Sequence, residues 1–137
     1  MSRLLEENKR KLEKAIKHLE YSFMKLQNLD DKLNLENDEI LETWESFAAR
    51  FSRVADIFLM RYIRSKILLE DPAFNGTFRD HLNQAEKLNI IESAQAWLAI
   101  RELRNVTAHE YNEDNLLEFY KKLETETPKL LALRELV

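Results

Sequence analysis

Apolar residues recur at helical spacing from the beginning of the chain. Within the first 27 residues, these positions are Leu5, Leu12, Ile16, Leu19, Phe23 and Leu26. Intervals of three, four and seven residues place side chains on one face of an α-helix. The pattern therefore predicts a first helix of about 25 residues, followed by a polar connection over residues 27–38.

A second apolar pattern predicts a long helix over residues 38–69, which at 1.5 Å per residue would be about 50 Å long. Its apolar face consists of Trp44, Phe47, Phe51, Val54, Ala55, Phe58, Tyr62 and Leu69. Asn37 or Asp38 can cap the start of this helix, because either side chain can accept a hydrogen bond from a free N–H of the first turn.

Basic residues gather on a different face of this long helix. Four arginines lie within about 80° of one another: Arg50, Arg53, Arg61 and Arg64. Between residues 50 and 66, five basic residues stand against one acid, Asp56, so this segment carries +4 and the remainder −8 of the total charge of −4. The stripe is a path for an anionic ligand, a solvated face that pairs with acids such as Glu42 and Glu45, or an interface to another helix. Asp56 lies offset from the stripe and is expected to orient an arginine.

Capping residues and apolar spacing in the second half of the chain predict three shorter helices. Thr77 and Asp80 form a capping pair that opens a helix to about residue 88, and another helix begins near residues 92–93. A polar break at residues 112–115 precedes the last helix, in which Thr127-Pro128 suits a kink or a cap. The apolar positions of the last two helices are Trp97, Ile100, Leu103, Leu116, Tyr120 and Leu123.

These elements predict an all-α fold, an up-and-down bundle of about five helices. A length of 137 residues corresponds to one domain, so we expect residues 1–137 to form a single unit. Tyr21, Tyr62 and Tyr120 lie at apolar helical positions or beside them, and they are expected in the core or at an interface. His18 is expected at the surface.

Composition narrows the chemistry that this chain can perform. One glycine cannot build a phosphate-binding glycine loop, and the absence of cysteine excludes thiol nucleophiles and thiolate metal sites. We expect neither a metal site nor a cofactor. The acidic start of the chain and the lack of a run of about 18 apolar residues lead us to expect a soluble, cytoplasmic protein without a membrane partner.

One short segment, residues 104–111, combines three chemically useful side chains. Arg104 is a fixed cation, His109 titrates near neutral pH and Tyr111 is a phenol. On an unbroken helix, Arg104 and Tyr111 share a face while His109 lies about 140° away. Convergence therefore requires the helix to end or distort before His109. The alternative is that the three side chains only cap a helix C-terminus and interact with its dipole.

The order Arg104-Asn105 … His109-Glu110-Tyr111 resembles the signature of HEPN-domain proteins, and specifically of the HepT-like toxins that pair with a minimal nucleotidyltransferase antitoxin. The upstream Ala96-Trp97-Leu98 and the long helix around residues 50–56 are also similar, and the resemblance covers about residues 5 to 125.

The resemblance implies a metal-independent endoribonuclease that acts as a homodimer, with Arg104 and His109 as the catalytic pair. Asn105 matches the supporting polar residue of the motif, and Tyr111 matches the tyrosine to which the partner nucleotidyltransferase attaches AMP. The four arginines of the long helix would then line the path of the RNA substrate.

An alternative of a different class is a non-catalytic adaptor that binds substrate for a nucleotidyltransferase. The acidic remainder of the surface suits such protein contacts.

Overall fold

The structure is a computed structural model that describes residues 3–106 and 113–137, so His109 and Tyr111 lie outside the described residues. Its elements are α1 (Arg3–Gln27), α2 (Asp38–Ile57), the π-helical segment η1 (Phe58–Tyr62), α3 (Ile63–Glu70), α4 (Phe78–Lys87), α5 (Ala94–Asn105), α6 (Glu113–Leu131) and the 3₁₀ segment η3 (Ala132–Leu136). Since α2, η1 and α3 follow one another without a break, the described part contains five helical bodies and no strand. The predicted all-α fold is therefore confirmed.

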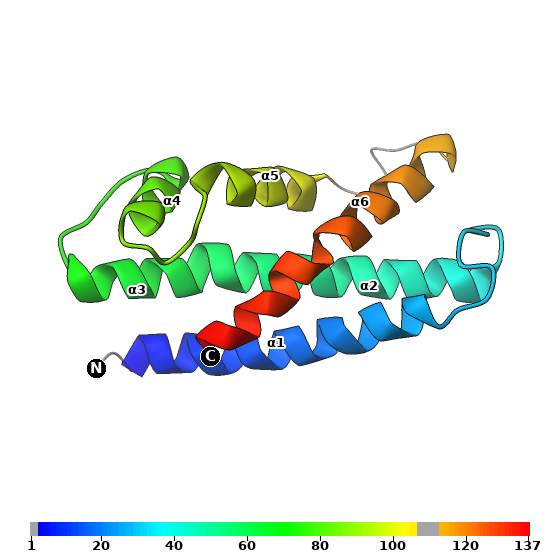
Figure 1. The fold of residues 1–137 in the computed structure, drawn as a ribbon, viewed down its shortest axis with the longest axis horizontal. Helices are drawn as coiled ribbons and strands as arrows, with labels where there is room; N and C mark the ends of the chain where they lie inside the picture. Colours follow the sequence, from blue (N-terminus) through cyan, green and yellow to red (C-terminus); the bar gives the residue numbers. More distant parts are fainter. Residues whose placement is uncertain (1–2, 107–112) are drawn as a thin grey trace.

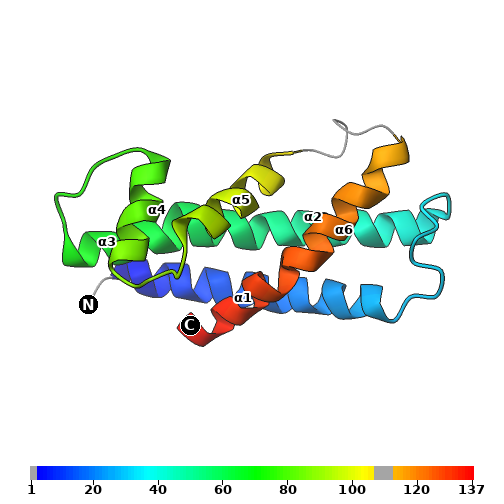
Figure 2. The ribbon, with the colours of Figure 1, turned by 45° about the horizontal axis from the view of Figure 1, so that its top comes forward.

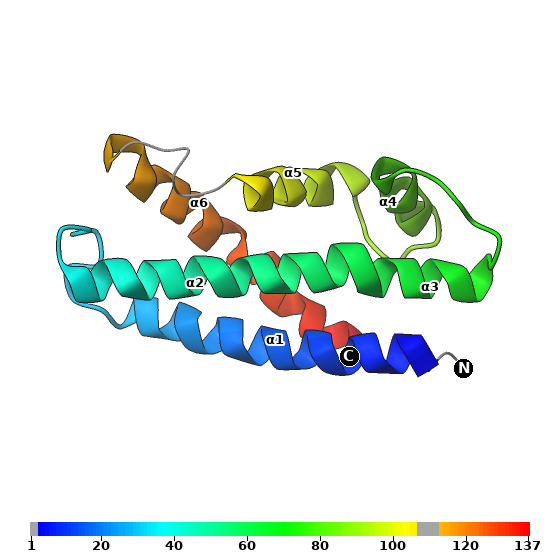
Figure 3. The same ribbon diagram turned by 180° about the vertical axis from the view of Figure 1, so that it is seen from behind.

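An antiparallel pair of long helices organises the molecule. α1 runs beside the continuous α2–η1–α3 helix, and α6 crosses both obliquely (Figure 1). The shorter α4 packs on α3, and α5 packs on α2 and α4, on the same side as α6 (Figure 2). Seen from behind, α1 and α2 lie side by side with no described helix in front of them (Figure 3).

The core forms where the apolar faces of α1, α2 and α6 meet. Leu12, Leu19 and Leu26 of α1 are fully buried, as their helical spacing predicts. Trp44 of α2 stacks on Tyr120 of α6 with ring centroids 5.4 Å apart, and its Nε1 donates to the Lys32 carbonyl at 2.7 Å. Burial raises the pKa of Tyr120 to about 12, with a smaller contribution from the charge of Glu45. This aromatic contact ties the α1–α2 connection, α2 and α6 together.

The π turn of η1 is a feature that the apolar pattern does not predict. The N–H of Ile63 donates to the carbonyl of Phe58, five residues back instead of the four of an α-helix. This turn of the helix therefore contains about one residue more than a regular α-helical turn. Every residue of α3 is thereby displaced by about 100° around the helix axis. The apolar face continues through Ile63 and Ile67, which are fully buried, whereas Leu69 is 44% exposed. The expectation that Leu69 belongs to the apolar face is therefore wrong.

Local signals set the ends of the other helices. The Asn37 side chain accepts hydrogen bonds from the first turn of α2, and Thr77 and Asp80 form the predicted capping box of α4. This box lowers the pKa of Asp80, chiefly through its hydrogen bond from the Thr77 backbone N–H. Ser93 caps α5, which ends at Asn105 with Val106 extended. The helix therefore ends before His109, as convergence of the motif requires.

Two expectations about α6 are corrected. The helix begins at Glu113, so residues 113–115 of the predicted polar break belong to α6. The helix also continues through Pro128 as one element, so the proline does not cap the start of a new helix. The Thr127 hydroxyl donates to the Leu123 carbonyl at 2.7 Å, and the buried Leu130 and Leu133 hold the following residues against the core. Packing on both sides of the proline offsets its missing backbone donor.

Truncation of a core leucine of α1 should destabilise the protein strongly. We expect Leu19→Ala to lower the free energy of unfolding by about 2–5 kcal/mol, because the side chain is fully buried and its removal leaves a cavity. The matched control is Leu33→Ala, in the connection between α1 and α2, where the leucine is 46% exposed and the loss should stay within about 0.5 kcal/mol. Urea denaturation followed by circular dichroism measures both, and equal losses would contradict this account of the core.

Candidate functional site

A bidentate ion pair joins the last turn of α5 to the middle of α2. The Arg104 Nε donates to Oδ1 of Asp56 at 2.9 Å, and its Nη2 donates to Oδ2 at 2.8 Å. The two side chains are 32% and 42% exposed, so the pair is only partly screened by solvent. The hydrogen bond to Asp56 raises the pKa of Arg104, which keeps the guanidinium charged and fixes its plane. Arg104 is therefore an oriented cation.

This pair lies at one edge of a surface depression of about 990 Å³ between α1, α2 and the end of α5. The charged and titratable residues that line it are Lys11, Lys14 and His18 from α1, Arg50, Arg53, Asp56 and Arg61 from the long helix, and Arg104 from α5. We call this surface the basic depression. Its lining holds six fixed cations and one carboxylate, and that carboxylate is bound to Arg104. Such a surface attracts phosphate groups.

The basic depression brings together three of the four arginines predicted for an RNA path. Arg50, Arg53 and Arg61 line it, whereas Arg64 is not among its lining residues in the part of the chain described. The π turn of η1 provides the reason, because it brings Arg61 to within about 20° of Arg53 and displaces Arg64 by about 100°. Arg53 projects about 160° from the buried Phe51, so this stripe faces away from the core.

Arg50 is anchored to α1 rather than to acids of its own helix. Its Nη1 donates to the Ser22 hydroxyl at 2.8 Å and to the His18 carbonyl at 3.2 Å, and its guanidinium lies 5.7 Å from the centre of the Tyr21 ring. No ion pair joins Arg50, Arg53 or Arg61 to a side chain within residues 3–106 or 115–137. Pairing of the stripe with Glu42 and Glu45 therefore receives no support, whereas the contacts of Arg50 with α1 agree with the alternative of an interface to another helix.

The apolar pattern of α1 does not predict its contribution to the basic depression, although His18 is exposed as expected. Lys11, Lys14 and His18 follow one another at intervals of three and four, so they lie within about 60° of one another. The same spacing argument that found the arginines would have found this stripe. Tyr21 continues it, and at 65% exposure it is not a core residue of this chain, unlike the buried Tyr62 and Tyr120.

The remaining motif residues are only partly described. Asn105 is the last residue of α5 and is exposed, whereas His109 and Tyr111 lie outside the described residues. The structure thus places Arg104 and Asn105 at a helix end beside the basic depression.

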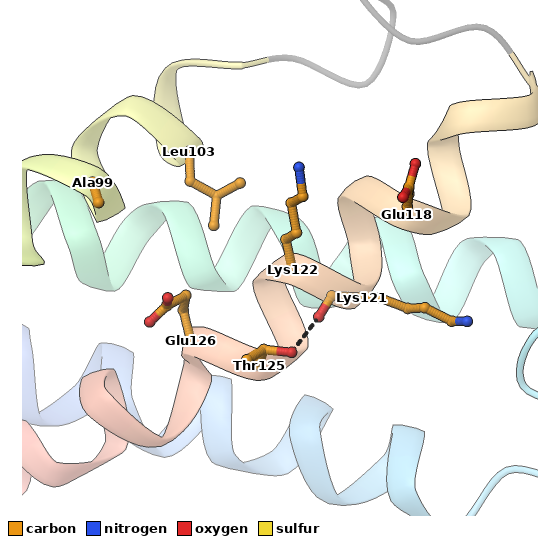
Figure 4. A pocket seen from close by; sticks show the side chains of 7 residues that line it. All are labelled: Ala99, Leu103, Glu118, Lys121, Lys122, Thr125 and Glu126. Carbon is orange, nitrogen blue, oxygen red and sulfur yellow. Dashed lines mark hydrogen bonds between the residues drawn. The ribbon is translucent and has the colours of Figure 1, made fainter.

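A second, smaller hollow of about 410 Å³ lies between α5 and α6 (Figure 4). Its lining combines Ala99 and Leu103 of α5 with charged side chains of α6. The Thr125 hydroxyl donates to the Lys121 carbonyl there, at 2.9 Å. Among the predicted site residues that the structure describes, none lines this hollow.

Within the described part of the chain, no group of three or more histidine, aspartate or glutamate side chains is placed to hold a metal ion. No helix among the described residues is both long and apolar enough to cross a membrane. Comparisons with protein-family models, with curated proteins and with solved structures gave no match. The functional argument therefore depends on the residues themselves.

A double-mutant cycle on Asp56 and Arg104 tests the ion pair. We expect Asp56→Ala, Arg104→Ala and the double variant to give a coupling energy of about 1 kcal/mol. The bidentate geometry makes the pair stronger than a single hydrogen bond, whereas its partial exposure to solvent reduces the attraction. Chemical denaturation at low and high salt measures this energy, which should fall as ionic strength rises. A coupling energy of zero at low salt would show that the pair does not form in solution.

Proposed function

We propose that this protein is a metal-independent endoribonuclease of the HepT-like HEPN type, the toxin component of a toxin–antitoxin pair, and that it acts in the cytoplasm. The observation that carries the proposal is the position of Arg104. The motif arginine is oriented by Asp56 and lies at the edge of a surface lined by six fixed cations. A residue that only capped a helix would not need such surroundings.

RNA carries its own nucleophile, which limits what the protein must supply. In the proposed reaction, His109 removes the proton of a 2′-hydroxyl, whose oxygen attacks the adjacent phosphorus. The protonated His109 then gives this proton to the leaving 5′-oxygen of the next nucleotide as the P–O bond breaks, and the products end in a 2′,3′-cyclic phosphate and a 5′-hydroxyl. Arginine side chains stabilise the additional negative charge on the phosphorane oxygens. No step requires a metal or a cofactor.

The geometry of Arg104 suits this role because its pairing with Asp56 leaves donors free. A guanidinium has five N–H groups, and the pair uses Nε and one hydrogen of Nη2. Nη1 and the second hydrogen of Nη2 remain for a phosphate oxygen. Asp56 and a substrate phosphate can therefore contact Arg104 at the same time.

A homodimer completes the proposed site. A twofold axis would let two chains contribute Arg104 and His109 to a shared cleft, with Asn105 supporting the motif beside Arg104. A nucleotidyltransferase antitoxin would silence this cleft by attaching AMP to Tyr111, because the added phosphodiester would occupy the place of a substrate phosphate and pair with Arg104.

Loss of either catalytic side chain should abolish RNA cleavage. We expect His109→Ala to reduce kcat/KM by about 10²- to 10⁴-fold and Arg104→Ala by about 10²- to 10³-fold, measured on labelled RNA in the presence of EDTA. Arg104→Lys should not restore activity, because an ammonium lacks the planar fork. Arg79→Ala, on the exposed side of α4, is the matched control and should keep full activity.

Cleavage that persists in both the His109 and the Arg104 variants would refute the proposed ribonuclease. An adaptor would instead bind the transferase tightly, while neither protein alone cleaved RNA.

Coexpression with the partner transferase should modify Tyr111. We expect the intact mass to rise by multiples of one AMP, and to remain unchanged in Tyr111→Phe. Tyr21→Phe is the control, because Tyr21 is the most exposed tyrosine within the described residues while Tyr62 and Tyr120 are buried. Modification that persists in Tyr111→Phe and disappears in Tyr21→Phe would contradict the assignment.

A further inference from the structure

α1 carries a polar stripe that neither the motif nor the arginines of the long helix explain. Lys11, Lys14, His18 and Tyr21 lie within about 80° of one another over about 15 Å of helix, and the first three line the basic depression. At about 3.4 Å per stacked nucleotide, this length accommodates four or five nucleotides. The stripe thus has the dimensions of a short segment of a polynucleotide.

The contacts of Arg50 join this stripe to the arginines of α2. Arg50 binds the Ser22 hydroxyl and the His18 carbonyl of α1, so the two rows of cations have fixed positions relative to each other. Lys14 and Arg53 form no ion pair with the described side chains, while Lys11 contacts Glu7 at 3.3 Å in an exposed i,i+4 pair. An exposed pair of this kind is weak, so Lys11 remains available to a phosphate.

Tyr21 adds a second, independent observation. It is 65% exposed although it is a large aromatic residue, and the guanidinium of Arg50 lies 5.7 Å from its ring centre, at the end of the cationic rows. A cationic groove with an exposed aromatic ring is the combination that binds single strands, in which unpaired bases stack on side chains. A duplex keeps its bases stacked inside and offers no free face to such a ring.

We propose that α1 forms half of a binding track for single-stranded RNA, in which Lys11, Lys14 and His18 contact the phosphate backbone and Tyr21 stacks on a base. This inference depends on the proposed function for its choice of RNA as the polymer. It adds the strandedness of the substrate and four residues that the motif does not include. The strand would run from Tyr21 along the α1–α2 surface toward Arg61 and Arg104.

Binding is best measured with an oligonucleotide that cannot be cleaved. A labelled 2′-O-methyl oligouridylate of about 12 nucleotides lacks the nucleophile, and a site of this kind covers about 4 to 16 nucleotides. Fluorescence anisotropy between about 50 and 200 mM salt gives the affinity and its salt dependence. For the double variant Lys11→Gln/Lys14→Gln, we expect the slope of log K against log salt to become shallower by about 1.4, since each phosphate contact contributes about 0.7.

The controls separate the track from general charge. Lys17→Gln removes an exposed lysine of the same helix that does not line the basic depression, and its slope should equal that of the unchanged protein. Tyr21→Ala should weaken single-strand binding by at least about fivefold, whereas Tyr21→Phe, which keeps the ring, should bind normally. Melting curves establish that each of these exposed-site variants is folded.

The outcomes distinguish this proposal from the ribonuclease proposal. Tighter binding of a matched RNA duplex than of the single strand, or an equal slope change in Lys17→Gln, would overturn the track. An unchanged slope in the α1 double variant would overturn it as well, even if the protein cleaves RNA through Arg104 and His109. The expected slopes in a protein that cleaves no RNA would support the track and refute the ribonuclease.

Discussion

The antiparallel packing of α1 against the long α2–η1–α3 helix is the constraint on which the rest of the structure depends. Each helix has one continuous apolar face. Burial of apolar surface stabilises a fold by about 25 cal/mol per Å², so these faces pack toward α6 and the core. The charged positions must then lie on the opposite side, where no described helix covers α1 and α2. The packing of the core therefore leaves one side of α1 and the long helix open to solvent, and Lys11, Lys14, Arg50, Arg53 and Arg61 line the basic depression there.

The sequence predicts the helices well because the signals for them are local. Seven-residue and three-to-four-residue spacing locates α1, and Asn37, Thr77 and Ser93 cap the helices that follow them. The end of α5 at Asn105 is less predictable, because the polar break in the sequence lies further on, at residues 112–115. The continuation of α6 through Pro128 depends on the burial of Leu130 and Leu133, which is a tertiary property. Composition near a proline cannot reveal that support.

The site was predictable only in part. Arg104, Asn105 and the arginines of the long helix could be proposed from residue types and spacing. The partner of Arg104 could not, because Asp56 is 48 residues away in sequence and meets it only after α5 has packed on α2. Tyr21 was expected in the core or at an interface, and spacing alone could not decide between them; the neighbouring helices of this chain leave its ring exposed. Spacing locates the face of a residue on its helix, but the packing of other helices decides what that face meets.

The π turn of η1 links the stability of one end of the molecule to the arrangement of charges at its centre. The same local rotation that turns Ile63 and Ile67 into the core brings Arg61 beside Arg53. If Phe58–Tyr62 formed a regular α-helix with the same number of residues, α3 would be rotated by about 100°, and both its apolar contacts and one cation of the basic depression would be misdirected. The burial of α3 and the position of Arg61 therefore depend on the same five residues.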